Sequence, residues 1–191
     1  MDHSLADIRL EAPVDRGYTP TAKALHWLIA ALVLTQFVIS FLMPDIGRNT
    51  LPGPLINLHL SFGIVILVAM ASRMLNRMQN PVPLDMHDSP AWERRAAAAM
   101  HVAFYLILLI GPFLGWASAS SHRLPVDVFG LITLPELAAP RARWANIAGD
   151  VHTYMMWTLL GLIALHVAAA LVHHFVRRDR TLLRMLPGRG T

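Results

Sequence analysis

Four long apolar stretches constrain what this 191-residue chain can fold into. They run approximately over residues 22–43, 54–75, 96–118 and 148–176. Each has about the 20 residues or more that a helix needs to cross a bilayer. A helix satisfies its own backbone polar groups, which hydrocarbon cannot do. We therefore predict an all-α integral membrane protein, with one four-helix bundle and a single transmembrane domain over residues 1–191.

Composition supports a membrane setting and excludes several cofactors. The chain is 55% hydrophobic and 15% charged, with a mean hydropathy of +0.47. No cysteine is present, so disulfides, iron–sulfur clusters, thiolate-ligated haem and covalently attached haem are excluded. The sequence pI is about 10.3, but the basic residues flank the apolar stretches and form no separate basic region. We therefore expect no nucleic-acid partner and direct contact with membrane lipid.

The distribution of positive charge predicts the topology. Residues before 22 are polar and lack the short apolar core of a cleavable signal, so we expect the first helix to remain as an anchor. Segments on the side of the two chain ends carry twelve Lys and Arg residues, and segments on the other side carry four. The positive-inside rule then places both ends in the cytoplasm. The predicted location is the bacterial inner membrane, crossed several times.

His152 and His166 are fourteen residues apart in the last apolar stretch. Fourteen residues make roughly 3.9 helical turns, so both imidazoles lie within about 40° of one helix face and about 21 Å apart along the axis. The hydrocarbon core of a bilayer is about 30 Å thick. One helix with a histidine toward each side of the membrane can therefore face two stacked cofactors, and haems are the natural candidates.

The predicted topology gives each histidine a depth. His26 lies near the cytoplasmic side with His166, and His59 lies near the outer side with His152. A haem held between helices by two axial ligands takes one from each of two helices. A single intramembrane histidine can also serve as a hydrogen-bonding residue between helices. Two pairs at matching depths favour haem ligation over this hydrogen-bonding role. We therefore predict two non-covalent b haems inside the bundle, with axial pairs His26/His166 and His59/His152.

Two further residues are candidates for contact with the inner cofactor. His101 begins the third stretch at the depth of His26 and His166, so it competes as a ligand; we interpret it as a residue beside the haem or a quinone contact. Arg73 lies fourteen residues after His59, on the same helix face and about 21 Å closer to the cytoplasm. It can bind a haem propionate, or it can extend to the lipid headgroups as a flanking charge.

The remaining histidines and the long outer loop have simpler interpretations. His173 and His174 are expected at the cytoplasmic interface, and we interpret His3, His87 and His122 as ordinary residues of polar loops. The loop between the third and fourth stretches contains an apolar segment over residues 126–137. We expect this segment to lie over the outer cofactor and limit its contact with water.

These motifs resemble the bacterial di-haem cytochrome b-561 family. The matching features are Ala24-Leu25-His26-Trp27, the segment Pro54-Leu55-Ile56-Asn57-Leu58-His59, and the spacing from His152 to His166 followed by an Ala-rich run to His173-His174. The resemblance covers nearly the whole chain, from Tyr18 to Pro187. It implies that His26, His59, His152 and His166 ligate two b haems.

The resemblance also implies an activity. Members of the family resemble superoxide oxidases, which pass an electron from periplasmic superoxide through the haems to ubiquinone. We therefore expect a superoxide:ubiquinone oxidoreductase, with a quinone and superoxide or another redox donor as partners. The alternatives are a cytochrome b subunit that anchors a periplasmic hydrogenase or formate dehydrogenase, and a non-redox membrane protein. The sequence carries no indication of oligomeric state.

Overall fold

The computed structural model describes residues 18–47, 49–81 and 90–186. Within these residues the chain forms four long helices: α1 (Pro20–Leu42), α2 (Pro54–Gln79), α3 (Ala91–Ser121) and α4 (Arg143–Leu171). Each is long and apolar enough to cross a membrane, which confirms the predicted fold class. His3 and His87 lie outside the described residues.

Local chemistry explains where the helices begin and end. The side chain of Thr19 accepts a hydrogen bond from the backbone of Ala22 and caps α1, and Pro20 and Pro54 stand in the first turns of α1 and α2, where a missing N–H costs nothing. Helix α2 ends four residues beyond the predicted stretch, and α3 begins five residues before it. The added residues, 76–79 and 91–95, are mostly polar. Both helices therefore continue beyond their apolar stretches.

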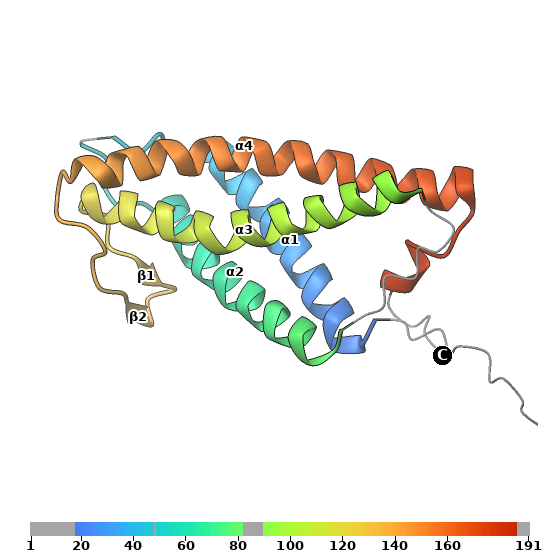
Figure 1. The fold of residues 1–191 in the computed structure, drawn as a ribbon. Helices are drawn as coiled ribbons and strands as arrows, with labels where there is room; N and C mark the ends of the chain where they lie inside the picture. The colour runs from blue at the N-terminus through green and yellow to red at the C-terminus, as the bar shows by residue number, and fades with distance from the viewer. Residues whose placement is uncertain (1–17, 48, 82–89, 187–191) are drawn as a thin grey trace, which may run out of the picture.

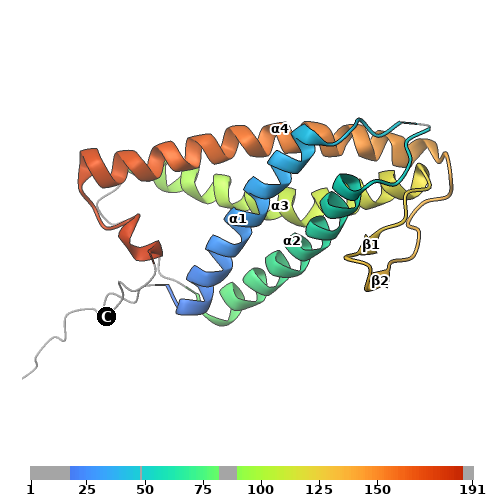
Figure 2. The same cartoon turned by 180° about the vertical axis from the view of Figure 1, so that it is seen from behind.

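The helices are arranged as two antiparallel pairs (Figure 1). Helix α1 packs along α2, and α3 packs along α4. The pairs lie close together at one end, which we call the hairpin end and which contains residues 43–47, 49–53 and 122–142. They diverge toward the other end, which we call the terminal end, where α1 begins and α4 ends (Figure 2). There the chain after α4 turns back toward the start of α1.

A buried apolar core fills the middle of the bundle. Leu159 of α4 is only 1% exposed and stands seven residues from both His152 and His166. It packs in one cluster with residues of the other three helices: Ile29, Val33, Ile66, Ala69, Met70, Ile107 and Leu108. The core therefore separates the histidines at the two ends.

The loop between α3 and α4 contains a small β-hairpin that the all-α prediction did not include. Strand β1 (Asp127–Val128) pairs antiparallel with β2 (Ile132–Thr133). Three residues, 129–131, connect the two strands. Phe129 and Gly130 have φ values of 53° and 74°, as the two central residues of a type I′ turn require, and the Leu131 amide donates to the Val128 carbonyl at 3.0 Å. The hydroxyl of Ser61 in α2 donates to the Asp127 carbonyl and accepts from the Phe129 amide, both at 3.0 Å. The hairpin is thus held against α2.

The close approach of α3 and α4 leads to a stability prediction. A Cβ atom added at Gly149 would lie 2.5 Å from the Ser118 hydroxyl oxygen and 3.1 Å from the Ser118 Cβ. We expect Gly149→Ala to lower the free energy of unfolding by about 1–3 kcal/mol through overpacking, measured by thermal unfolding in detergent.

Gly161→Ala on the same helix is the matched control, because a Cβ there meets no heavy atom within 4 Å. This variant should be as stable as the unmodified protein or slightly more stable, since alanine is the better helix former by about 1 kcal/mol. Equal stability of the two variants would contradict the close packing.

Candidate functional site

The structure brings the histidines together in the two pairs expected from their depths. At the hairpin end, the ring centres of His59 (α2) and His152 (α4) are 6.3 Å apart. At the terminal end, those of His26 (α1) and His166 (α4) are 6.4 Å apart. Each pair joins one helix of the α1–α2 pair to α4. Their role as haem ligands stays a prediction.

Both spacings fit an iron atom held between two imidazoles. Two metal–nitrogen bonds of about 2 Å, with about 1.2 Å from each nitrogen to its ring centre, place the ring centres about 6.4 Å apart. The observed values are 6.3 and 6.4 Å. The side chains therefore already stand at the separation that bis-histidine ligation requires.

A cavity of about 960 Å³ surrounds the pair at the hairpin end. This is near the upper end of the range of about 300–1,000 Å³ for cavities that hold small molecules and cofactors. All the long helices and the loop after α3 line it, including Gln36, His59, Gly63, Gly115, Val126 and His152. Val126 of the apolar loop segment is buried and lines this cavity. That the segment as a whole lies over a cofactor stays a prediction.

Helix α3 positions the His152 ring. The Nδ1 atom of His152 donates to the Gly111 carbonyl at 2.9 Å, which leaves Nε2 for a metal. Such a hydrogen bond from the second ring nitrogen is typical of metal-ligating histidines. A Cβ at Gly115 would lie 3.2 Å from Cε1 and 3.3 Å from Nδ1 of the same ring. The glycine therefore provides the space in which the imidazole lies.

His59 has a different environment. The side-chain amide of Gln36 donates from Nε2 to the backbone carbonyl of His59 at 2.8 Å. Among the described residues, the buried side-chain polar atoms without a hydrogen-bond partner are Gln36 Oε1 and His59 Nδ1. Each such atom costs about 1–3 kcal/mol. The contact between Gln36 and His59 therefore leaves one buried polar atom of each side chain without a hydrogen bond.

A third imidazole joins the pair at the terminal end. The ring centres of His101 and His166 are 5.8 Å apart, and His101 Nδ1 donates to the Ala97 carbonyl at 2.8 Å. Phe104 packs edge-on against His166. The spacing to His101 is shorter than an iron between two imidazoles needs, whereas that between His26 and His166 fits. The distances favour His26 as the opposite ligand and place His101 beside the pair.

Basic and aromatic residues connect the start of α1 to its neighbours. Arg73 of α2 donates to the Ala22 carbonyl at 2.8 Å, one turn before His26. Lys23 donates from Nζ to the Leu186 carbonyl at 3.3 Å, and Trp27 donates from Nε1 to the Met185 carbonyl at 2.8 Å. Arg73 thus lies beside the terminal-end pair, while the segment after α4 covers the first turns of α1.

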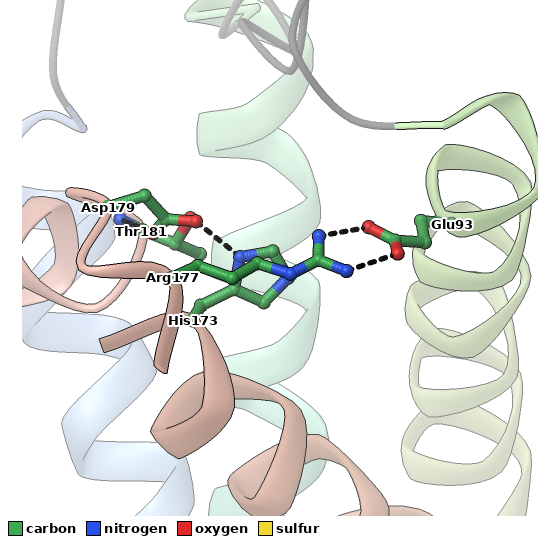
Figure 3. Close-up of polar contacts among 5 residues, drawn as sticks. All are labelled: Glu93, His173, Arg177, Asp179 and Thr181. Carbon is green, nitrogen blue, oxygen red and sulfur yellow. Dashed lines mark hydrogen bonds and ion pairs between the residues drawn. The ribbon is translucent and has the colours of Figure 1, made fainter. Parts of the chain in front are cut away.

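The chain after α4 is held by a polar cluster (Figure 3). It continues as a π-helical segment (Val172–Arg177) and later forms a 3₁₀ turn (Leu183–Met185). Arg177 donates twice to the Glu93 carboxylate at 2.5 Å, while His173 and the Thr181 amide donate to Asp179.

The stabilising contribution of Asp179 to this cluster depends on pH. Burial raises the pKa of Asp179, but the hydrogen bonds from His173 and Thr181 outweigh it and hold the pKa below its ordinary value of 3.8. The contribution of Asp179 is therefore present above pH 3.8 and is lost as the pH falls through the lower folded value. His173 has this specific partner, which its interpretation as a simple interfacial residue did not include.

Three residues of the hairpin-end cavity were not recognised from the sequence. His122 caps α3, lines the cavity and donates from Nδ1 to the Ser118 carbonyl at 2.9 Å, although it was interpreted as an ordinary loop residue. Gln36 could have been identified from the sequence, because an amide side chain inside an apolar span is costly unless it has hydrogen-bond partners. Gly115 had no distinguishing signal beside other small residues.

Helices that can span a membrane and that carry facing histidine pairs define a class, the multi-helix membrane cytochromes. Residues 17–188 match the family model described as prokaryotic cytochrome b561, and the chain belongs to that family. It is therefore an electron-transfer protein of a bacterial membrane, from a family that binds b-type haem.

Named relatives agree with this assignment. Cytochrome b561 homolog 2 of Escherichia coli (strain K12) is 31% identical over 174 residues, which cover 88% of this chain and 90% of the relative. Cytochrome b561 homolog 1 of the same strain is 29% identical over 175 residues, or 90% and 98% of the two chains. A protein named probable superoxide oxidase CybB, from Yersinia pestis, is 31% identical over 172 residues, or 90% and 97%.

The contact between Gly115 and His152 generates a prediction about haem content. Gly115→Val should displace the His152 ring and weaken the binding of one haem by about tenfold or more, as disturbances around a metal ligand commonly do. Haem content per chain and the electron paramagnetic resonance spectrum of the ferric protein would measure this. Gly161→Val is the control, and equal haem content in both variants would rule out the proposed role of Gly115.

Proposed function

We propose that the chain holds two b haems, between His59 and His152 and between His26 and His166, and moves electrons from periplasmic superoxide to ubiquinone across the inner membrane. The observation that carries the proposal is the spacing of 6.3 and 6.4 Å in two pairs that share α4. When bound, each haem supplies a one-electron redox centre.

The residues around the two pairs favour electron transfer over chemistry on a bound substrate. With a histidine from each of two helices as ligands, a bound haem would have no position left for O₂ or another ligand at the metal. The apolar cluster around Leu159 fills the space between the pairs and keeps water out of it. Because positive charge predicts that both chain ends are cytoplasmic, the hairpin end faces the periplasm.

The hairpin end suits an anionic donor. Arg123, Arg141 and Arg143 lie in or beside the loop after α3, and all three are exposed. A positive surface raises the local concentration of a small anion such as superoxide. Two superoxide ions give up one electron each and leave as O₂; the two electrons with two protons convert ubiquinone to ubiquinol. The relative named as a probable superoxide oxidase supports this choice of donor.

The terminal end suits the quinone. His101 is half-buried beside His166, and its Nε2 is left free by the bond from Nδ1 to Ala97. An imidazole can bind and release protons near neutral pH, so His101 can take up a proton from water at Nε2 and deliver it to a reduced quinone. Arg73, next to His26 through its bond to Ala22, can balance a haem propionate. We assign both residues to the cytoplasmic cofactor site.

Loss of one ligand should separate the two haem sites. His59→Ala and His152→Ala should each abolish the same haem and leave the other, because the apolar core separates the pairs. Quantification of haem as its pyridine complex, with redox titration of the remaining component, would measure this. His174→Ala, in the π-helical segment that follows α4, is the control and should retain both haems. Retention of both haems in either site variant would disprove the pairing.

The proposed reaction is tested with the purified, haem-loaded protein. A steady supply of superoxide should reduce its haems and form ubiquinol when ubiquinone is present, and superoxide dismutase should abolish both effects. If superoxide does not reduce the haems, the assigned donor is wrong. Reduction only by a co-purifying periplasmic oxidoreductase would instead show a membrane-anchor subunit.

A further inference from the structure

Gln36 is an amide side chain within α1, in a largely apolar span of the sequence. It lines the hairpin-end cavity and contacts the backbone of His59. A carbonyl oxygen accepts only from a donor, so the NH₂ group of Gln36 must face the His59 carbonyl. This fixes the orientation of the amide and leaves Oε1 as its free end.

The free end of Gln36 and the free nitrogen of His59 complement each other. Gln36 Oε1 is a buried acceptor without a donor, and His59 Nδ1 is a buried ring nitrogen without a partner. They belong to the two residues joined by the bond from Gln36 Nε2 to the His59 carbonyl, although the two atoms do not hydrogen-bond to each other in this structure. A Cβ at Gly63 would make ordinary van der Waals contact with Gln36 Nε2, at 3.7 Å, so the amide packs against α2 at this glycine.

The opposite ligand shows what His59 lacks. His152 donates from Nδ1 to the Gly111 carbonyl and so has a fixed tautomer, as metal-ligating histidines generally do. We propose that Gln36 Oε1 accepts the Nδ1–H of His59 and thereby positions this histidine with Nε2 toward the iron. The proposal rests on the assignment of a haem between His59 and His152. Gln36 is a positioning residue and does not ligate the metal.

A hydrogen bond from Nδ1–H makes an imidazole a stronger electron donor to iron, which stabilises the oxidised state. Gln36 therefore lowers the potential of the hairpin-end haem and leaves that of the other haem unchanged. Removal of the acceptor should raise this one potential.

Redox titration of two variants tests this directly. Gln36→Leu should shift the reduction equilibrium of one haem toward the reduced state by about tenfold, which is about 59 mV for a one-electron couple. Thr35→Ala, at an exposed α1 residue whose hydroxyl donates to the Ala31 carbonyl of its own helix, is the matched control and should change neither potential. Unchanged potentials in a Gln36→Leu protein with two haems would overturn the proposal.

A measurement on the unmodified protein does not depend on whether the variants fold. The sequence contains two glutamines, Gln36 and Gln79, so a ¹³C label on the glutamine side-chain carbonyl marks few groups. The infrared difference spectrum on haem reduction should contain a labelled carbonyl band that persists in Gln79→Asn, which removes the glutamine at the exposed end of α2. Absence of any labelled band would contradict the hydrogen bond.

These outcomes are distinguishable from failure of the haem assignment. If His59→Ala retains both haems, the assignment itself is wrong. If His59→Ala loses one haem, the haem assignment holds. If both haem potentials in Gln36→Leu then equal those of the unmodified protein, Gln36 has no positioning role.

Discussion

An imidazole inside a membrane needs a polar partner. Helix α4 carries two imidazoles, those of His152 and His166, on one face. Each faces a histidine from the α1–α2 pair at a distance that a single metal ion can bridge. The two helix pairs contact each other mainly through α2 and α3, so bridging metals would add two cross-links where α4 faces α1 and α2. On this account the cofactors hold the bundle together as well as carry electrons.

The rest of the structure serves these two junctions. Gly115 leaves space for one ligand ring, and the Gly111 carbonyl orients it. Ser61 holds the small hairpin against α2 and so keeps the loop after α3 near the cavity. At the other end, Trp27 and Lys23 bind the returning chain through its backbone carbonyls. The surroundings of the two histidine pairs are thus built differently.

Periodicity and depth were sufficient to predict the spanning helices and to bring together the right histidines, because a helix that crosses a bilayer has a fixed rise per residue. They were not sufficient for contacts that depend on side-chain direction. The bond from Gln36 to His59 and the place of His122 in the cavity follow from how the helices rotate and tilt, which no spacing rule encodes. The type I′ turn at Phe129 and Gly130 was also missed, because it lies within an apolar segment that reads as an interfacial stretch.

The central claim is that each chain holds two haems, each between two histidines. The most direct measurement is the ratio of haem b to polypeptide in the purified protein, combined with electron paramagnetic resonance of the ferric state. The account predicts two low-spin haems per chain, without a high-spin signal. A single haem per chain, or a high-spin signal from an open axial position, would contradict it.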